Sequence, residues 1–230
     1  MKKTFADKVI QFNSKLVSPN KVPAEFTVLN PFIDNPETMQ VMKAFYRKYF
    51  NDHRPRRMLL GINPGRHGAA VTGVPFTDTK RLEEICGLPM YSVRTHEVSS
   101  VFIYDMISNY GGVEKFYSDF YINSPFPLAI VREKNGKQVN ANYYDDKELF
   151  NSVREYMIEN LRAHIALGID TSCAFVLGIK NHRFISELNK EAQLFDQLIP
   201  LEHPRYIQQY KSKDKEQFIG NYLEAFIQER

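Results

Sequence analysis

The stretch Met58-Leu59-Leu60-Gly61-Ile62-Asn63-Pro64-Gly65 decides the fold that the sequence predicts. A short apolar run ends there in a tight Gly/Pro turn that carries one polar side chain, Asn63. α/β proteins place their chemistry in this way, at the carboxyl end of a strand. A second segment, Thr72-Gly73-Val74-Pro75-Phe76, follows and supplies an aromatic ring. We therefore expect Asn63 and Phe76 to border one pocket.

The composition describes an ordinary globular protein. The chain has 230 residues, 43% of them hydrophobic, which suits one domain with a sizeable core. A net charge of +3 is compatible with nucleic acid but does not indicate it alone. Cys86 and Cys173 form no C-x-x-C pair, which argues against an iron–sulfur or structural zinc site and fits a reducing cytosol. We expect no signal peptide, and no apolar run approaches the ~18 residues of a membrane span.

Predicted strands and helices alternate along the chain. Apolar runs and turn signals predict strands at 56–62, 116–123, 128–131, 138–142, 172–179 and 198–201, with Asn135-Gly136 as a hairpin turn. Helical periodicity predicts helices at 4–14, 36–50, 78–85, 99–110, 145–167, 182–195 and 215–228, and 18–35 is expected to be extended. This alternation predicts an α/β fold with a mainly parallel sheet.

Three polar residues, Asn63, Asn123 and His203, each follow a predicted strand. The carboxyl ends of parallel strands meet at one edge of a sheet, so we expect these residues to share a crevice. Two amides, an imidazole and the Phe76 ring suit a planar heterocycle, which an aromatic face can stack on and an amide can read. Taken singly, each residue is as well explained as a turn former, a cap or a core side chain.

Other common catalytic motifs are absent from the sequence. It contains no dinucleotide fingerprint, no Walker-type Gly-Lys-Ser/Thr, no Gly-x-Ser-x-Gly elbow and no His-rich metal spacing. Asp145-Asp146 is interpreted as charge that complements a helix dipole. The basic clusters at 54–57 and 211–215 are interpreted as solvated surface.

Three segments together resemble the single-strand-selective monofunctional uracil-DNA glycosylases, a family within the uracil-DNA glycosylase superfamily. They are the 61–76 segment, Tyr121-Ile-Asn-Ser-Pro-Phe-Pro-Leu128 and Leu201-Glu-His-Pro-Arg205. The resemblance implies a three-layer α/β/α fold, a single domain over residues 1–230, and a DNA glycosylase of a divergent bacterial branch. Its reaction would release uracil, including 5-substituted uracil, from DNA and leave an abasic site.

The resemblance also implies a role for each site residue. Asn63 would position the attacking water, and Phe76 would stack on the flipped uracil. Asn123 would bind the amide edge of the base and so reject cytosine, while His203 would stabilise the departing uracil anion. Further residues implied to line the base pocket are Gly61, Ile62 and Gly65.

The chain departs from the family pattern in two places. The last family motif usually reads His-Pro-Ser-Pro-Arg, whereas this chain has His203-Pro204-Arg205-Tyr206. Arg205 and Tyr206 are therefore the candidates for the wedge that fills the gap left by a flipped base. Arg66-His67 replaces a Pro-aromatic pair, which makes His67 a candidate DNA contact and could alter the range of bases that fit.

The implied partner is uracil-containing DNA, single- or double-stranded, with no cofactor, no metal and no membrane. A monomer in the bacterial cytoplasm, associated with the nucleoid, is expected. One alternative keeps the fold but takes xanthine or hypoxanthine, since an Asn123 amide can flip to suit either edge. Another is a catalytically silent binder of damaged or single-stranded nucleic acid. A hydrolase of free nucleotides is less favoured, and strand cleavage would need a lysine that these motifs lack.

Overall fold

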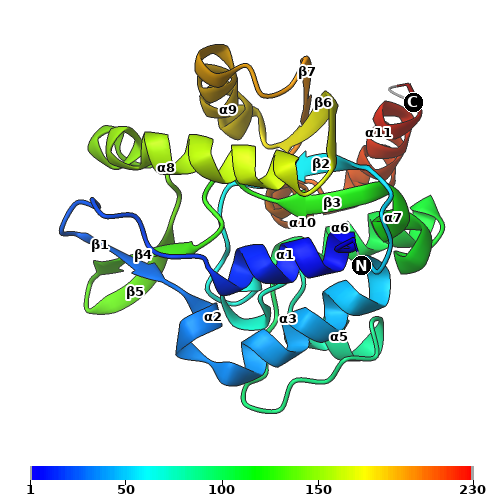
Figure 1. The fold of residues 1–230 in the computed structure, drawn as a ribbon, viewed down its shortest axis with the longest axis horizontal. Helices are drawn as coiled ribbons and strands as arrows, with labels where there is room; N and C mark the ends of the chain where they lie inside the picture. The colour runs from blue at the N-terminus through cyan, green and yellow to red at the C-terminus, as the bar shows by residue number, and fades with distance from the viewer. Residues whose placement is uncertain (1, 229–230) are drawn as a thin grey trace.

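The computed structural model describes residues 2–228, and its centre is a four-stranded parallel sheet (Figure 1). The strands lie in the order β3-β2-β6-β7, and each neighbouring pair is parallel. Their bounds are Phe120–Asn123 for β3, Arg56–Leu60 for β2, Ile169–Leu177 for β6 and Gln197–Leu201 for β7. The predicted parallel sheet is confirmed.

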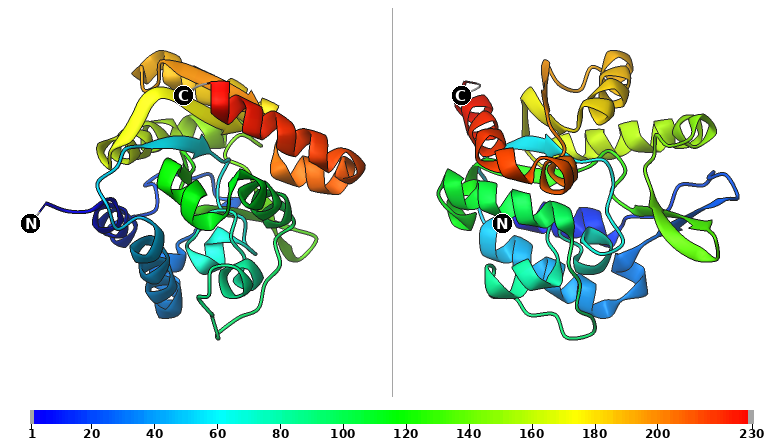
Figure 2. Two further views of the ribbon diagram at one scale, coloured as in Figure 1. Left: turned by 90° about the vertical axis from the view of Figure 1, so that its right-hand side faces the viewer. Right: turned by 180° about the vertical axis from the view of Figure 1, so that it is seen from behind.

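Helices cover both faces of this sheet. The longer ones are α1 (Phe5–Ser14), α3 (Pro36–Tyr49), α6 (Val98–Tyr110), α8 (Lys147–Ala166), α9 (Ile179–Ala192) and α11 (Lys215–Gln228). Seen from behind, α6 and α11 lie in front of the sheet and α1 lies beyond it (Figure 2). Short helices connect these elements: α2 (Pro31–Asp34), α4 (Ala69–Thr72), α5 (Thr79–Glu84), α7 (Val113–Asp119), α10 (Pro204–Tyr210) and the 3-10 helix η1 (Ser212–Asp214).

Side chains of β3 alternate between the two helical layers, as strand geometry requires. Phe120 packs against Phe226 of α11, with ring centroids 4.5 Å apart. Its neighbour Tyr121 packs in the other direction, 5.4 Å from Phe5 of α1 and 5.6 Å from His164 of α8. The expected three-layer α/β/α arrangement is therefore confirmed.

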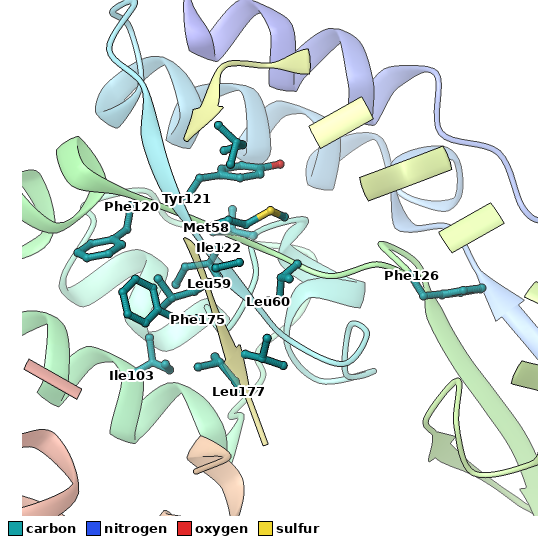
Figure 3. Close-up of a cluster of buried hydrophobic side chains, with 14 of the residues drawn as sticks. Met58, Leu59, Leu60, Ile103, Phe120, Tyr121, Ile122, Phe126, Phe175 and Leu177 are labelled. Atoms are coloured by element: carbon teal, nitrogen blue, oxygen red, sulfur yellow. The ribbon is translucent and has the colours of Figure 1, made fainter. Parts of the chain in front are cut away.

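The centre of the core is the apolar run of β2. Met58, Leu59 and Leu60 are completely buried in β2, between the partners β3 and β6 (Figure 3). A strand covered on both faces needs apolar residues at every position, and this run has them. Within residues 2–228, no helix is both long and apolar enough to cross a membrane.

A second, antiparallel sheet extends the fold beside the parallel one. Its strands are β1 (Phe26–Leu29), β4 (Ala129–Lys134) and β5 (Lys137–Ala141), in the order β1-β4-β5. The predicted hairpin is confirmed: Asn135 and Gly136 have φ angles of 53° and 71°, the left-handed pair that a tight hairpin turn needs. The extended prediction for 18–35 agrees with the strand β1 but missed the short helix α2.

Three element predictions need correction. The predicted strand 116–123 is wrong in its first half, because α7 runs to Asp119 and β3 begins at Phe120. Its aromatic residues favour either state, and packing on the core selects the helix. Gly178 caps α9, so that helix starts at Ile179 rather than at 182, and β6 begins earlier than the predicted 172. The predicted elements also lack α10, the short helix that follows β7.

A buried arginine ties the start of β2 to its surroundings. Arg56 is 1% exposed, and its guanidinium donates to both carboxylate oxygens of Asp52 at 2.9 Å and to the Tyr117 carbonyl at 2.8 Å. The same group lies 4.7 Å from the ring centroids of Phe5 and Phe50. These contacts satisfy the charge where β2 enters the core.

We predict that Asp52→Ala lowers the free energy of unfolding by about 3 kcal/mol, because it leaves the Arg56 charge buried without its carboxylate. Arg54→Ala is the matched control: Arg54 binds the same carboxylate from an exposed position and should cost less than about 1 kcal/mol. Urea denaturation measures both.

The pH dependence of the free energy of unfolding gives a second test of the ion pair between Asp52 and Arg56. Burial raises the pKa of Asp52, but hydrogen bonds from Arg56 and Arg54 outweigh it and bring the pKa to about 2. The stabilisation that the Asp52 carboxylate provides is therefore complete when the pH is above its ordinary pKa of 3.8. It is lost as the pH falls through about 2. Equal losses for Asp52→Ala and Arg54→Ala would contradict this account.

Candidate active site

The predicted strand-end residues come together at the carboxyl edge of the parallel sheet. Asn63 follows β2, Asn123 ends β3, and His203 follows β7. Asn63 and Phe76 line an outer cleft of about 300 Å³ together with His203, and an inner pocket of about 30 Å³ together with Asn123. The two hollows share this wall, so the four side chains belong to one site.

The carboxamide of Asn63 is held by the segment that follows the hairpin. Its Nδ2 donates to the carbonyl of Ala141 at 3.1 Å, and its Oδ1 accepts from the amide N–H of Tyr143 at 3.2 Å. Because a carbonyl must meet the amide nitrogen and an N–H must meet the oxygen, this pairing sets the orientation of the group. One N–H and one lone pair of Asn63 remain for a ligand.

Phe76 closes over the turn after β2. Its φ of 52° is left-handed, which is unusual for a residue with a side chain. A Cβ placed on Gly61 would lie 3.1 Å from Phe76 Cε2, so only glycine lets the ring approach this closely. The ring centroid lies 6.1 Å from that of His203. Gly61 therefore serves the site by admitting the aromatic ring.

His203 caps the N-terminus of α10 through its ring. Nδ1 accepts from the backbone N–H of Arg205 at 3.1 Å, which places the ring proton on Nε2. Burial, and then the positive charge of Arg205, lower the pKa of His203 to about 4. The ring is consequently neutral at neutral pH and presents an Nε2–H donor.

Asn123 is nearly buried at the inner end of the site, with 6% exposure. Its Oδ1 accepts from the backbone N–H of Ser124 at 2.9 Å, and its Nδ2 donates to the Tyr121 hydroxyl at 2.7 Å. The backbone carbonyl of Asn123 accepts from Gly61 N–H at 2.8 Å. Asn123 is therefore positioned through both its backbone and its side chain.

The remaining predicted residues divide into three groups. Gly61, Ile62 and Gly65 line the inner pocket, as expected. Arg205 and Tyr206 line the outer cleft, where Tyr206 is 42% exposed and packs beside Tyr210, with ring centroids 5.8 Å apart. His67 is exposed and lines neither of these two hollows, and its contact with DNA stays a prediction.

Glu97 belongs to both hollows and escaped the sequence analysis. Its Oε2 is buried without a hydrogen-bond partner, and its carboxyl packs so closely on Gly65 and Gly68 that a Cβ on Gly68 would overlap it. Burial and then the charge of Asp78 raise its pKa, Arg205 opposes them, and the resulting pKa is about 7. The only signal in the sequence was the pair of glycines, whose need for close approach becomes clear only in three dimensions.

Comparison with known proteins identifies the family of this chain. Residues 47–227 match the family model described as "Uracil DNA glycosylase superfamily". The chain belongs to the uracil DNA glycosylase superfamily. Among solved structures it is similar to SMUG2 from Pedobacter heparinus, with 47% identity over 97% of each chain and a TM-score of 0.94. No curated protein matches.

Membership of the uracil DNA glycosylase superfamily confirms the resemblance drawn from the three motifs. The matched residues span β2 to α11 and so include every strand end that borders the site. Among residues 2–228 of this glycosylase-family chain, no group of three or more His, Cys, Asp or Glu side chains could hold a metal ion.

We predict that Glu97→Gln changes how stability depends on pH. In the folded chain the carboxyl has a pKa of about 7, above its ordinary 4.5, so its ionisation disfavours the folded state as the pH rises through this window. The variant does not ionise. Its stability relative to wild type should therefore increase by up to about 3 kcal/mol between acidic and alkaline pH.

Urea denaturation between pH 4.5 and 8 measures this difference. Glu25→Gln is the control, because Glu25 is exposed. A plot of its free energy of unfolding against pH should run parallel to that of wild type. If the plot for Glu97→Gln also ran parallel to that of wild type, the result would contradict the buried, unpartnered state of this carboxyl.

Proposed function

We propose that the protein is a monofunctional DNA glycosylase that hydrolyses the N-glycosidic bond of uracil in DNA and leaves an abasic site. One observation carries this proposal in a chain of this superfamily. Asn63, Asn123 and His203 converge on one pocket as neutral groups, each with its polar atoms oriented by a backbone amide. Such an array suits a neutral heterocycle that leaves as an anion.

Binding begins with a nucleotide flipped out of the strand, because the reacting bond is inaccessible in a base stack. The base enters the inner pocket and stacks on Phe76. Asn123 then accepts the N3–H of uracil at Oδ1 and donates from Nδ2 to O4. Cytosine offers the opposite pattern on that edge, an acceptor at N3 and an amine at C4, so the pairing excludes it.

Bond cleavage transfers the electron pair of the C1′–N1 bond to the base. Negative charge develops on N1 and O2, and the Nε2–H of His203 donates to O2 to stabilise it. A neutral imidazole suits this role, since the Arg205 backbone N–H occupies Nδ1 and keeps the proton on Nε2. The gain comes from a donor that is already oriented when the charge appears.

Water completes the reaction by attacking C1′. Asn63 cannot take a proton as a carboxylate would, so its contribution is to orient the water through its free N–H and lone pair. The new C1′–O bond replaces C1′–N1, and the proton lost by the water ends in solvent or on the released base. No lysine lines either hollow among the described residues, which supports hydrolysis without strand cleavage.

DNA would lie across the outer cleft. We propose that Tyr206 occupies the space left by the flipped base and that Arg205 contacts the backbone, because both side chains border the cleft on α10. Tyr210 adds a second exposed ring, 73% accessible, which suits stacking with an unpaired base. Single-stranded uracil DNA is therefore the substrate that this surface favours.

The chain is proposed to act as one domain over residues 1–230 and as a monomer. Asn140 and Ala141 of the hairpin line the same cleft as His203 near the C-terminus, so distant parts of one chain complete the site. With DNA as its substrate, the enzyme would work in the bacterial cytoplasm at the nucleoid.

The alternatives are less well supported by the geometry. Hypoxanthine and xanthine share the N–H and carbonyl edge of uracil, but the pocket that holds Asn123 is the smaller of the two hollows, which suits the smaller, single-ring base. A catalytically silent binder would not need the oriented Asn63 and His203 groups.

We predict that Asn63→Ala lowers the single-turnover rate on labelled, single-stranded uracil DNA by at least about 100-fold and leaves DNA binding unchanged, because the water loses its positioning group. The assay is run in EDTA, and the products are read with and without alkali. Wild type should give breaks only after alkali. Asn109→Ala is the control, since Asn109 is exposed on α6 and bonds only within its own helix.

Equal rates for the Asn63 and Asn109 variants would contradict the role of Asn63. No abasic product from wild type on uracil would contradict uracil excision and direct the assay to xanthine and hypoxanthine. Failure on all three bases would favour the silent binder.

A further inference from the structure

The orientation of the Asn123 amide is determined by its neighbours. The backbone N–H of Ser124 can bond only to an oxygen, so Oδ1 faces it at 2.9 Å and Nδ2 must face the Tyr121 hydroxyl at 2.7 Å. One Nδ2 proton and one Oδ1 lone pair remain for a ligand. The amide therefore shows the pocket a donor and an acceptor in one fixed order.

The Tyr121 hydroxyl must send its own proton elsewhere, because its oxygen accepts from Asn123. The ring nitrogen Nδ1 of His164 lies 3.4 Å from that oxygen and can receive the proton. Tyr121 and His164 are both completely buried, so water does not compete for these groups. With the ring proton of His164 on Nε2, Asn123 donates to Tyr121 and Tyr121 donates to His164, beside the Tyr46 hydroxyl, which also hydrogen-bonds with Tyr121.

His164 keeps this direction stable. Burial lowers the pKa of His164 to about 3, so the ring is neutral at neutral pH. With Nδ1 as the acceptor its proton sits on Nε2, which is buried without a hydrogen-bond partner. A protonated His164 would instead donate towards Tyr121 and disturb the chain.

We propose that Tyr121 and His164 are positioning residues that set base specificity, by locking the Asn123 amide in the orientation that accepts an N–H and donates to a carbonyl. This inference rests on the proposed function. Deamination produces that edge, because it replaces a ring acceptor beside an amine by an N–H beside a carbonyl. The fixed orientation of the Asn123 amide thus recognises the edge of a deaminated base.

A rotated Asn123 amide, or cytosine in the pocket, would place donors against donors and acceptors against acceptors. A rotated amide would turn Nδ2–H against the Ser124 N–H and leave His164 Nδ1 without a donor. Cytosine in the pocket would set its N3 lone pair against Oδ1 and its amine against Nδ2–H. Each uncompensated buried group is costly, so the locked amide excludes cytosine without any steric barrier.

The experiment compares single-turnover excision of uracil and cytosine from matched single-stranded oligonucleotides. Tyr121→Phe removes the hydroxyl, and His164→Leu removes the acceptor. We expect each to lower the uracil-to-cytosine rate ratio by about tenfold or more, the effect of one lost hydrogen bond. His164→Asn should restore the ratio, because its carbonyl can replace the Nδ1 acceptor.

Tyr117→Phe is the matched control, since its hydroxyl is buried without a hydrogen-bond partner. A merely structural defect would slow uracil excision without changing the ratio. An unchanged ratio in a folded Tyr121→Phe, or in a folded His164→Leu should Tyr121→Phe not fold, would overturn the inference. Failure of wild type to release uracil would instead overturn the proposed function itself.

Discussion

The site depends on one backbone contact, the hydrogen bond from Gly61 N–H to the Asn123 carbonyl at 2.8 Å. It extends the pairing of β2 with β3 one step beyond the strands and brings the turn after β2 against the end of β3. Glycine suits this position, because a Cβ there would lie only 3.1 Å from the Phe76 ring and would push it away. Strand pairing, the Phe76 ring and Asn123 therefore meet at a single residue.

The polar groups of the site share a second property, since backbone amides orient them. Ser124 N–H determines the direction of Asn123, Tyr143 N–H that of Asn63, and Arg205 N–H the tautomer of the catalytic histidine candidate. Backbone donors cannot titrate or rotate away, so the array is preorganised and need not rearrange as charge develops. Glu97 is the exception, a buried carboxyl in the same hollows that lacks any such partner.

Local signals explain what the sequence could predict. The apolar run of β2 and its Gly/Pro turn are readable without tertiary information, and so are the Asn135-Gly136 hairpin and the placement of Asn63 at a strand end. Tertiary packing decided the rest. Segment 116–123 is rich in aromatic residues, which suit a helix or a strand, and packing on the core makes its first half helical. The closeness of Glu97 to the glycine turn, and the Tyr121–His164 chain, come from elements far apart in the sequence and have no local signature.

A crystal structure with a single-stranded oligonucleotide carrying 2′-fluoro-2′-deoxyuridine, which resists cleavage, tests the central claim most directly. The account predicts the uracil stacked on Phe76, with N3–H bonded to Asn123 Oδ1 and O2 within hydrogen-bond distance of His203 Nε2. A base bound outside the inner pocket, or inside it with O2 turned away from His203, would contradict the proposed chemistry.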